Sequence, residues 1–255
     1  MTAHLYLSPH LDDAVFSCGG LMAMQDARGE PVSVLTIFAG DPPDWHISPL
    51  AADLHARWGK AGPPIAVRRA EDRLACGRLG TTIVHLNFHD AIYRADPEGL
   101  PMYSTEERLF GEVHAQDMDL VEQIREAFME ADISMAKVYC PLAMGGHVDH
   151  RIIRMAAERF MRPLTYYFDF PYAARGGDVP PELGRPSGEC VFVPLTEDAI
   201  ETWAHAVTEY QTQLSTFWED ETQLFAELRD YHDSQGGIPL LTQALGTNAE
   251  SNWVS

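Results

Sequence analysis

Basic side chains are scarce in this 255-residue sequence. It has 18 Lys and Arg against 38 Asp and Glu, which gives a formal net charge of −20 at pH 7. A charge of this sign and size repels phosphate backbones and anionic lipid headgroups. We therefore expect neither a nucleic acid nor a membrane as a partner.

Long apolar runs are also missing. No stretch approaches the roughly 18 uncharged apolar residues that a membrane-spanning helix needs. The N-terminal stretch has no basic segment and reaches Asp12 and Asp13 before any apolar run of signal-peptide length. We therefore expect a cytoplasmic protein.

Cysteine is too sparse for a disulfide framework or a cysteine zinc site. The cysteines are far apart, show no CxxC spacing and have apolar neighbours, and they are Cys18, Cys76, Cys140 and Cys190. We expect all of them to be free, buried thiols.

Short β-rich runs alternate with stretches of helical length in the first two thirds of the chain. The expected strands cover residues 4–8, 31–39, 82–86, 137–141 and 164–168, and the expected helices cover 15–28, 66–79, 118–131 and 149–161. The hydrophobic fraction of 45% is enough for a substantial core. This alternation predicts an α/β fold with a mainly parallel sheet and helices on both faces.

The pattern loosens after residue 171. A Gly/Pro-rich stretch at 175–188 precedes an expected strand at 190–194, one long helical segment at 197–231, and a loop or tail from Ser234 onward. No linker, internal repeat or low-complexity tract divides the chain. We expect a single domain over residues 1–255, with a core at 4–170 and a C-terminal appendage at 171–255.

Three polar residues, His10, Asp12 and Asp13, directly follow the first expected strand. In open α/β sheets, ligands bind outside the carboxyl ends of the strands. One aspartate would be enough to cap the following helix. Two adjacent carboxylates repel each other, so a nearby cation would help to keep both ionised. The segment is therefore either a helix cap with a loop histidine or part of a cation site.

A second polar cluster, "GGHVDHR" at residues 145–151, follows the strand at 137–141. His147 and His150 are three residues apart, so they face the same side at the start of a helix, and Asp149 between them is placed to orient a ring. Solvated histidines beside a helix N-terminus are the alternative interpretation. Together the two clusters offer two histidines and one aspartate with open positions, the ligand set of a catalytic zinc or a non-haem iron(II).

Both clusters resemble signatures of one family. "PHLDDAVFSCGG" is similar to the PHPDDE…GG signature, and "HVDHR" to the HxDH signature, of the LmbE-like/PIG-L family of zinc-dependent N-acetylglucosamine de-N-acetylases. The segments "GEPVSVLTIFAGD", "RRAEDRLACGRLG", "NFHDA", "YYFDFPYA" and "YQTQL" extend the resemblance over most of residues 5 to 215. Leu11 and Ala14 replace the usual proline and glutamate, and "AESNW" is only loosely similar to the family's C-terminal ending.

The resemblance implies a Rossmann-like three-layer fold and a metal-dependent hydrolase that removes an N-acetyl or other acyl group from an amino sugar, a related glycoside or another small-molecule amide. The implied cofactor is Zn²⁺, with Fe²⁺ or another divalent metal as the alternative, and the implied partner is a small N-acetylated molecule. The implied roles are metal ligand for His10, Asp13 and His150, general base for Asp12, oxyanion stabiliser for His147, orienting carboxylate for Asp149, and substrate contact for Arg68 and Asp90.

Other interpretations of the same residues stay open. A zinc-dependent hydratase acting on an unsaturated carboxylic acid would use the same metal-activated water, but would need arginines in its pocket. An iron(II) oxygenase fits less well, because its ligands are usually carried on an antiparallel barrel. A non-catalytic metal-binding module would not need Asp12.

The sequence gives structural alternatives for the remaining residues. Arg68 and Asp90 would serve equally in surface salt bridges. Gly19 and Gly20 are expected to allow close packing of their helix against the sheet. Substrate choice is expected to depend on loops at 41–64 and 93–111 and on the C-terminal segment.

Overall fold

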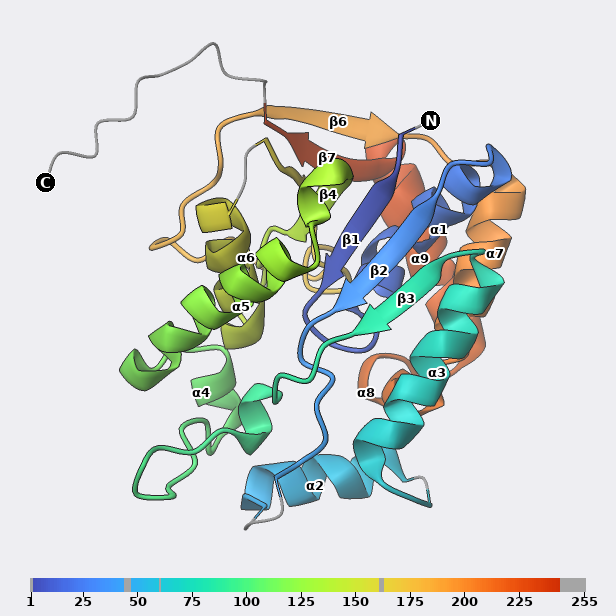
Figure 1. Ribbon diagram of the computed structural model, residues 1–255. Coiled ribbons are helices and arrows are strands. Elements are labelled where there is room, and N and C mark those ends of the chain that lie inside the picture. The colour runs from blue at the N-terminus through green and yellow to red at the C-terminus, as the bar shows by residue number, and fades with distance from the viewer. Residues whose placement is uncertain (1, 44–46, 60, 161–162, 244–255) are drawn as a thin grey trace, which may run out of the picture.

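The computed structural model describes residues 2–43, 47–59, 61–160 and 163–243, and these residues form a seven-stranded sheet in the order β3-β2-β1-β4-β5-β7-β6 (Figure 1). The strands are β1 (His4–Ser8), β2 (Val32–Thr36), β3 (Thr82–His85), β4 (Lys137–Pro141), β5 (Thr165–Tyr167), β6 (Glu189–Val193) and β7 (Ile238–Thr242). β1 to β5 pair in parallel, whereas β7 pairs antiparallel with both β5 and β6. The predicted α/β fold with a mainly parallel sheet is confirmed.

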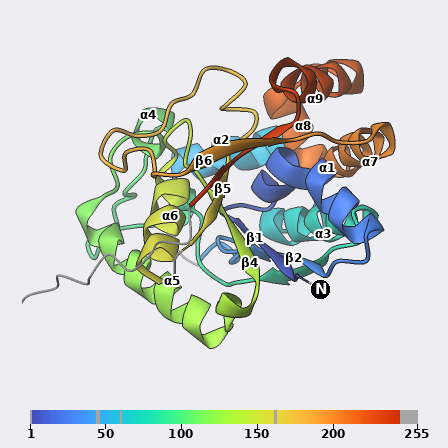
Figure 2. The same cartoon turned by 90° about the horizontal axis from the view of Figure 1, so that it is seen from above.

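Helices cover both faces of the sheet, as Figures 1 and 2 show. One face carries α1 (Asp13–Ala27), α3 (Pro64–Arg78), α7 (Glu197–Val207) and α9 (Glu221–Gln235), and the other carries α5 (Met118–Glu130) and α6 (Val148–Phe160). Side chains alternate along each strand, so Tyr6 packs into the first core and Leu7 into the second. Within the described part of the chain, no helix is long and apolar enough to cross a membrane.

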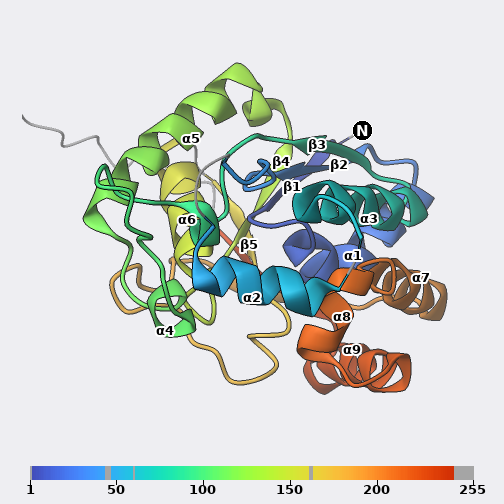
Figure 3. The same ribbon diagram turned by 90° about the horizontal axis from the view of Figure 1, so that it is seen from below.

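The carboxyl ends of β1 and β4 meet at the point where the strand order reverses. From β1 the chain moves outward to β2 and β3, and from β4 it moves the other way to β5. A crevice forms at such a reversal and is the usual ligand site in open α/β sheets. Three helices from different parts of the chain lie off this edge, namely α2 (Pro49–Trp58), α4 (Glu106–Leu109) and α8 (Gln211–Phe217) (Figures 1 and 3).

The prediction of one long helix over 197–231 is wrong, because α7, α8 and α9 are separate helices. Buried carboxylates of α3 hold the chain between α7 and α8. The Tyr210 hydroxyl donates to Asp72 at 2.6 Å, and Glu71 accepts from both the backbone and the hydroxyl of Thr212. Asp220 then starts α9 by accepting from the backbone N–H of Gln223.

The expected tail from Ser234 onward is also wrong for the residues that the structure describes. The helix α9 ends at Gln235, and β7 follows as a strand between β5 and β6. Proline cannot donate to the ladder, so Pro239 is unusual in a strand that has neighbours on both sides. β5 pairs only with residues 240–242, so Pro239 lies beyond its end. The segment "AESNW" and the expected helix end at Met161 lie outside the described residues.

Smaller corrections concern helix packing, the loops and one cysteine. A Cβ on Gly19 would lie 2.4 Å from Trp203 of α7, and one on Gly20 would lie 2.4 Å from Leu195, which shortly precedes α7 in the chain. Both glycines therefore allow α1 to pack closely against α7 and the residues before it, and not against the sheet as expected. The 41–64 segment, expected as a loop, contains α2, which begins after the N-cap Ser48. Cys190 is half-buried, whereas the other cysteines are buried.

Candidate active site

The loop after β1 places His10, Asp12 and Asp13 at the crevice edge. Ser8 shapes this loop, since its hydroxyl donates to the carbonyl of His10 and accepts from the backbone N–H of Ala14. Asp12 occupies the N-cap position of α1, but its side chain makes no capping hydrogen bond. The Asp13 carboxylate turns back and accepts from the backbone N–H of His10 at 2.7 Å. The simple capping interpretation of this segment is therefore wrong.

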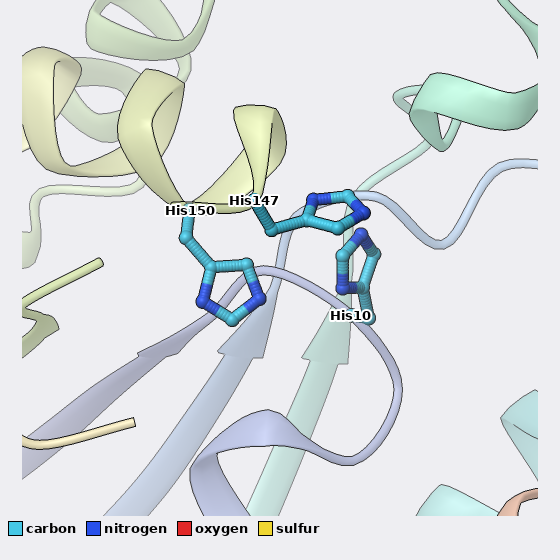
Figure 4. Close-up of side chains that lie close together, drawn as sticks. All are labelled: His10, His147 and His150. Atoms are coloured by element: carbon cyan, nitrogen blue, oxygen red, sulfur yellow. The ribbon is translucent and has the colours of Figure 1, made fainter. Parts of the chain in front are cut away.

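The two predicted clusters come together in space. Oδ2 of Asp13 lies 3.1 Å from Nδ1 of His10 and 3.3 Å from Nε2 of His150. His147 joins them, because the rings of His10, His147 and His150 each place a nitrogen within 4.8 Å of the others (Figure 4). The structure therefore brings the three imidazole rings together and places the Asp13 carboxylate against two of them.

Buried carboxylates fix the histidines on either side of Asp13. His150 donates from Nδ1 to Asp169 at 2.7 Å, and His10 donates from Nε2 to Asp149 at 2.9 Å. A histidine held in this way by one nitrogen presents the lone pair of the other, as metal-binding histidines do. The second nitrogen of each ring, Nε2 of His150 and Nδ1 of His10, faces Asp13, and its lone pair would be the donor to a metal held there.

Asp169 was missed at the level of sequence, and the role expected for Asp149 is corrected. The Asp149 side chain contacts His10, not His147 or His150; it also accepts from the Ala91 N–H and from Arg94. Asp149 lies in the first turn of α6, and its side chain reaches His10 in the loop after β1. A signal for Asp169 existed, because it follows β5 at the same edge of the sheet.

Asp12 and Arg68 form a buried pair beside this cluster. Nη2 of Arg68 lies 3.2 Å from Oδ2 of Asp12, and the Arg68 guanidinium lies over the Trp58 ring at 4.8 Å. Burial raises the pKa of Asp12 to about 6, although the positive charge of Arg68 opposes this rise. Among the described residues, the buried Nε of Arg68 has no hydrogen-bond partner. Arg68 is thus not in an exposed salt bridge, and one of its donors is unused.

His147 is a neutral imidazole in this arrangement. Burial and the neighbouring His10 hold its pKa well below the ordinary value. Its Nδ1 accepts a hydrogen bond from the backbone N–H of Asp149 at 3.2 Å. A neutral imidazole that accepts at Nδ1 carries its proton on Nε2, so His147 has one N–H to donate.

A cavity of about 360 Å³ opens onto these side chains. Asp90 lies at its edge; one oxygen accepts from the backbone N–H of Ile92 and the other lies 3.9 Å from Nε2 of His10. Both arginines of the lining are paired, Arg68 with Asp12 and Arg57 with Glu106. The apolar part of the lining comes from Leu54, Trp58, Ile92, Leu109, Phe110, Tyr172 and Phe217.

The fold and this site define an α/β protein with a candidate metal centre and an adjacent carboxylate. The chain belongs to the GlcNAc-PI de-N-acetylase (PIG-L) family, whose sequence pattern matches residues 5–161. The resemblance seen in the sequence is therefore confirmed.

Characterised relatives and solved structures are similar over nearly the whole chain. The 2′-N-acetylparomamine deacetylase of Niallia circulans is 29% identical over 240 residues, which are 87% of this chain and 84% of that protein. The A40926 pseudoaglycone deacetylase Dbv21 is 32% identical, with a TM-score of 0.78 over 98% of this chain and 99% of its own. The zinc-inhibited form of the teicoplanin deacetylase Orf2 is 27% identical, with a TM-score of 0.78 over 96% and 100% of the two chains.

Proposed function

We propose that this protein is a metal-dependent hydrolase that removes an N-acetyl or related N-acyl group from an amino sugar or a glycoside. The observation that carries the proposal is the different placement of two adjacent carboxylates. Both line the cavity, but Asp13 contacts His10 and His150, whereas Asp12 contacts Arg68. Hydrolysis by an activated water requires a metal ligand and, beside it, a carboxylate that does not bind the metal and can act as the base.

The residues at the site fit a divalent metal. Two imidazole nitrogens and one carboxylate oxygen converge, and each imidazole is oriented by a buried carboxylate. This nitrogen and oxygen donor set suits zinc or iron(II). We assign His10, Asp13 and His150 as the ligands. When bound, the metal would acidify a water molecule and polarise the amide carbonyl.

Asp12 serves as the general base. Its carboxylate lines the cavity and is held by Arg68 within a buried environment. A carboxylate with a raised pKa is suited to take a proton from the attacking water and to return it to the departing amine. One positioned carboxylate can thus serve both steps of amide hydrolysis, the attack of water and the departure of the amine.

His147 stabilises the oxyanion that forms when water adds to the amide. Its Nδ1 is occupied by the backbone N–H of Asp149, so the Nε2–H is the group left to donate. A preorganised donor in a buried site stabilises developing negative charge without reorganisation. Because His147 also lies within reach of the other two histidines, replacing it must be tested for metal content as well as for rate.

The cavity lining favours a neutral or cationic glycoside over a polycarboxylate. Arg57 and Arg68 are each paired with a carboxylate of the site, so neither is an unpaired cation for an acidic substrate. The hydratase alternative would need such cations. We assign Arg68 and Asp90, which both line the cavity, to contacts with substrate hydroxyl groups. The deacetylase relatives support the same reaction class.

The test is an amine-release assay on 2′-N-acetylparomamine, N-acetylglucosamine and simple N-acetylglucosamine glycosides, paired with elemental analysis of the same preparation. We expect about one metal per chain and amine release that stops on chelation. Reconstitution with Zn²⁺, Fe²⁺ and Co²⁺ in turn identifies the metal that supports turnover. Stoichiometric metal without release from any of these amides would contradict the proposal.

A further inference from the structure

Arg94 is a buried arginine, and the hydrogen bonds of its side chain are made with other groups inside the protein. Its side chain is 8% exposed, and each of its nitrogens has an acceptor. Nη2 lies 2.6 Å from Oδ1 of Asp149, Nε lies 2.9 Å from Oδ2 of Asp117, and Nη1 lies 3.0 Å from the carbonyl of His89. The guanidinium therefore joins the start of α6, the start of α5 and the loop after β3.

Aromatic rings hold this guanidinium in place. Its centre lies 5.0 Å from the ring centroid of Phe38 and 5.3 Å from that of Tyr103. A planar guanidinium between rings, with a carboxylate on two of its edges, has little freedom to rotate. Arg94 is therefore a rigid support for whatever it contacts.

The partner that matters for the site is Asp149. This carboxylate is fully buried, with Arg94 on one oxygen and His10 and the Ala91 N–H on the other. Arg94 is thus the permanent cation that balances the charge of Asp149. Since Asp149 accepts from Nε2 of His10, it fixes both the rotation of the His10 ring and the nitrogen that carries its proton.

We propose that Arg94 is a positioning residue for the metal site: by holding Asp149, it keeps His10 with Nε2 on Asp149 and Nδ1 turned towards Asp13. The inference rests on the ligand set of the proposed function. In the described part of the chain, the hydrogen bonds of the Arg94 side chain go to Asp149, Asp117 and His89 and to none of the assigned ligands, so its effect passes through Asp149. Partners that orient metal-binding histidines typically contribute about 10–100-fold to metal affinity.

The chain offers a matched control for this idea. Asp117 binds the opposite edge of the guanidinium and has no contact with His10 or Asp149 among its hydrogen bonds in the described residues. Asp117→Asn disturbs the same buried arginine but leaves the path from Arg94 to His10 intact. Any effect of Arg94 variants that comes only from general loosening would also follow from Asp117→Asn.

The experiment measures the equilibrium affinity of the full chain for Zn²⁺ by competition with a chromogenic chelator, and the visible spectrum of the Co²⁺-loaded protein. We expect Arg94→Met to weaken Zn²⁺ binding about 10–100-fold and to change the Co²⁺ spectrum. Arg94→Lys should restore part of the affinity, because it keeps the charge but not the two-edged contact. Asp117→Asn should bind as the wild type does.

A double-mutant cycle tests whether Arg94 acts through Asp149. In the Asp149→Asn background, Arg94→Met should add little further loss, because the group through which it acts is already changed. The double variant removes both charges of the buried pair, so neither is left without its partner. It can therefore still be compared with Asp149→Asn if Arg94→Met alone does not fold. Additive losses in the cycle would overturn the inference.

Two more outcomes are decisive. A folded Arg94→Met with wild-type Zn²⁺ affinity and an unchanged Co²⁺ spectrum would overturn the inference, and so would an equal loss in Asp117→Asn. The readouts use no substrate. A wild-type protein that binds metal but releases no amine would therefore refute the proposed function and leave the assignment of Arg94 standing.

Discussion

Nη2 of Arg68 lies 3.2 Å from Oδ2 of Asp12, and both side chains are buried beside the candidate metal ligands. The pair joins α3 to the N-cap of α1 across the carboxyl edge of the sheet. Asp12 thereby has a fixed direction and a compensating charge without using its carboxylate as a helix cap.

Arg68→Met should therefore reduce both stability and turnover. It leaves the Asp12 carboxylate buried without its cation, which costs on the order of 3 kcal/mol in the free energy of unfolding. We expect kcat to fall by roughly tenfold or more, a part of the 10²–10⁴ that a positioned general base contributes. Urea unfolding and steady-state kinetics measure the two effects.

Arg69→Met is the matched control for that variant. Arg69 is the next residue on α3; it pairs with the exposed Asp41 and donates to the carbonyl of Ala39, so its loss leaves no buried carboxylate without a cation and should cost less than the loss of Arg68. Equal effects of Arg68→Met and Arg69→Met would show that the buried pair has no special role.

Asp12→Asn should keep the metal and lose the reaction. Asparagine has nearly the shape of aspartate but cannot accept the proton, so kcat should fall about 10²–10⁴-fold while metal content stays near one per chain. Elemental analysis and amine release on the same sample separate the two properties. Unchanged turnover with full metal would exclude Asp12 as the base.

The sequence was sufficient to predict that the two His/Asp clusters lie close together, because of a topological rule. His10 and His150 are far apart in the chain, but each follows a parallel strand, and the ends of β1 and β4 are neighbours. The residues that orient them were harder to find. Asp169 follows β5 whereas His150 lies in α6, and Arg94 contacts Asp149 from an irregular loop. The spacing of residues in the sequence therefore does not predict either contact.

The C-terminal part of the fold was misread because its decisive contacts are also distant. The break between α7 and α8 depends on carboxylates of α3 that hold Tyr210 and Thr212, and no helix-ending residue marks it. The strand β7 has a recognisable signal, since the short apolar run IPLL follows Gly236 and Gly237.

Gly19→Ala should destabilise the protein through the contact between α1 and α7. A Cβ at this position would lie 2.4 Å from Cδ1 of Trp203, whose ring is fully buried and whose Nε1 donates to the carbonyl of Val15. Overpacking of this kind costs about 1–3 kcal/mol. The midpoint of urea unfolding measures it.

Gly77→Ala is the control for that substitution, because Gly77 lies within α3 and a Cβ there would have no heavy atom within 4 Å. Alanine should stabilise this helix by about 0.4–1 kcal/mol. A stabilising Gly19→Ala would contradict the assignment of Gly19 to close packing.

Removing the metal should lower the stability of the folded chain as well as its activity. A ligand that binds only the folded state at 100 times its dissociation constant contributes about 2.7 kcal/mol, so chelation should lower the melting temperature and added Zn²⁺ should restore it. Asp13→Asn should lose this zinc-dependent shift, because it weakens the oxygen donor that lies between His10 and His150. Asp12→Asn should keep the shift, since its side chain faces Arg68 instead. A zinc-dependent shift of full size in Asp13→Asn would remove Asp13 from the ligand set and favour the alternative in which His147 joins the other two histidines.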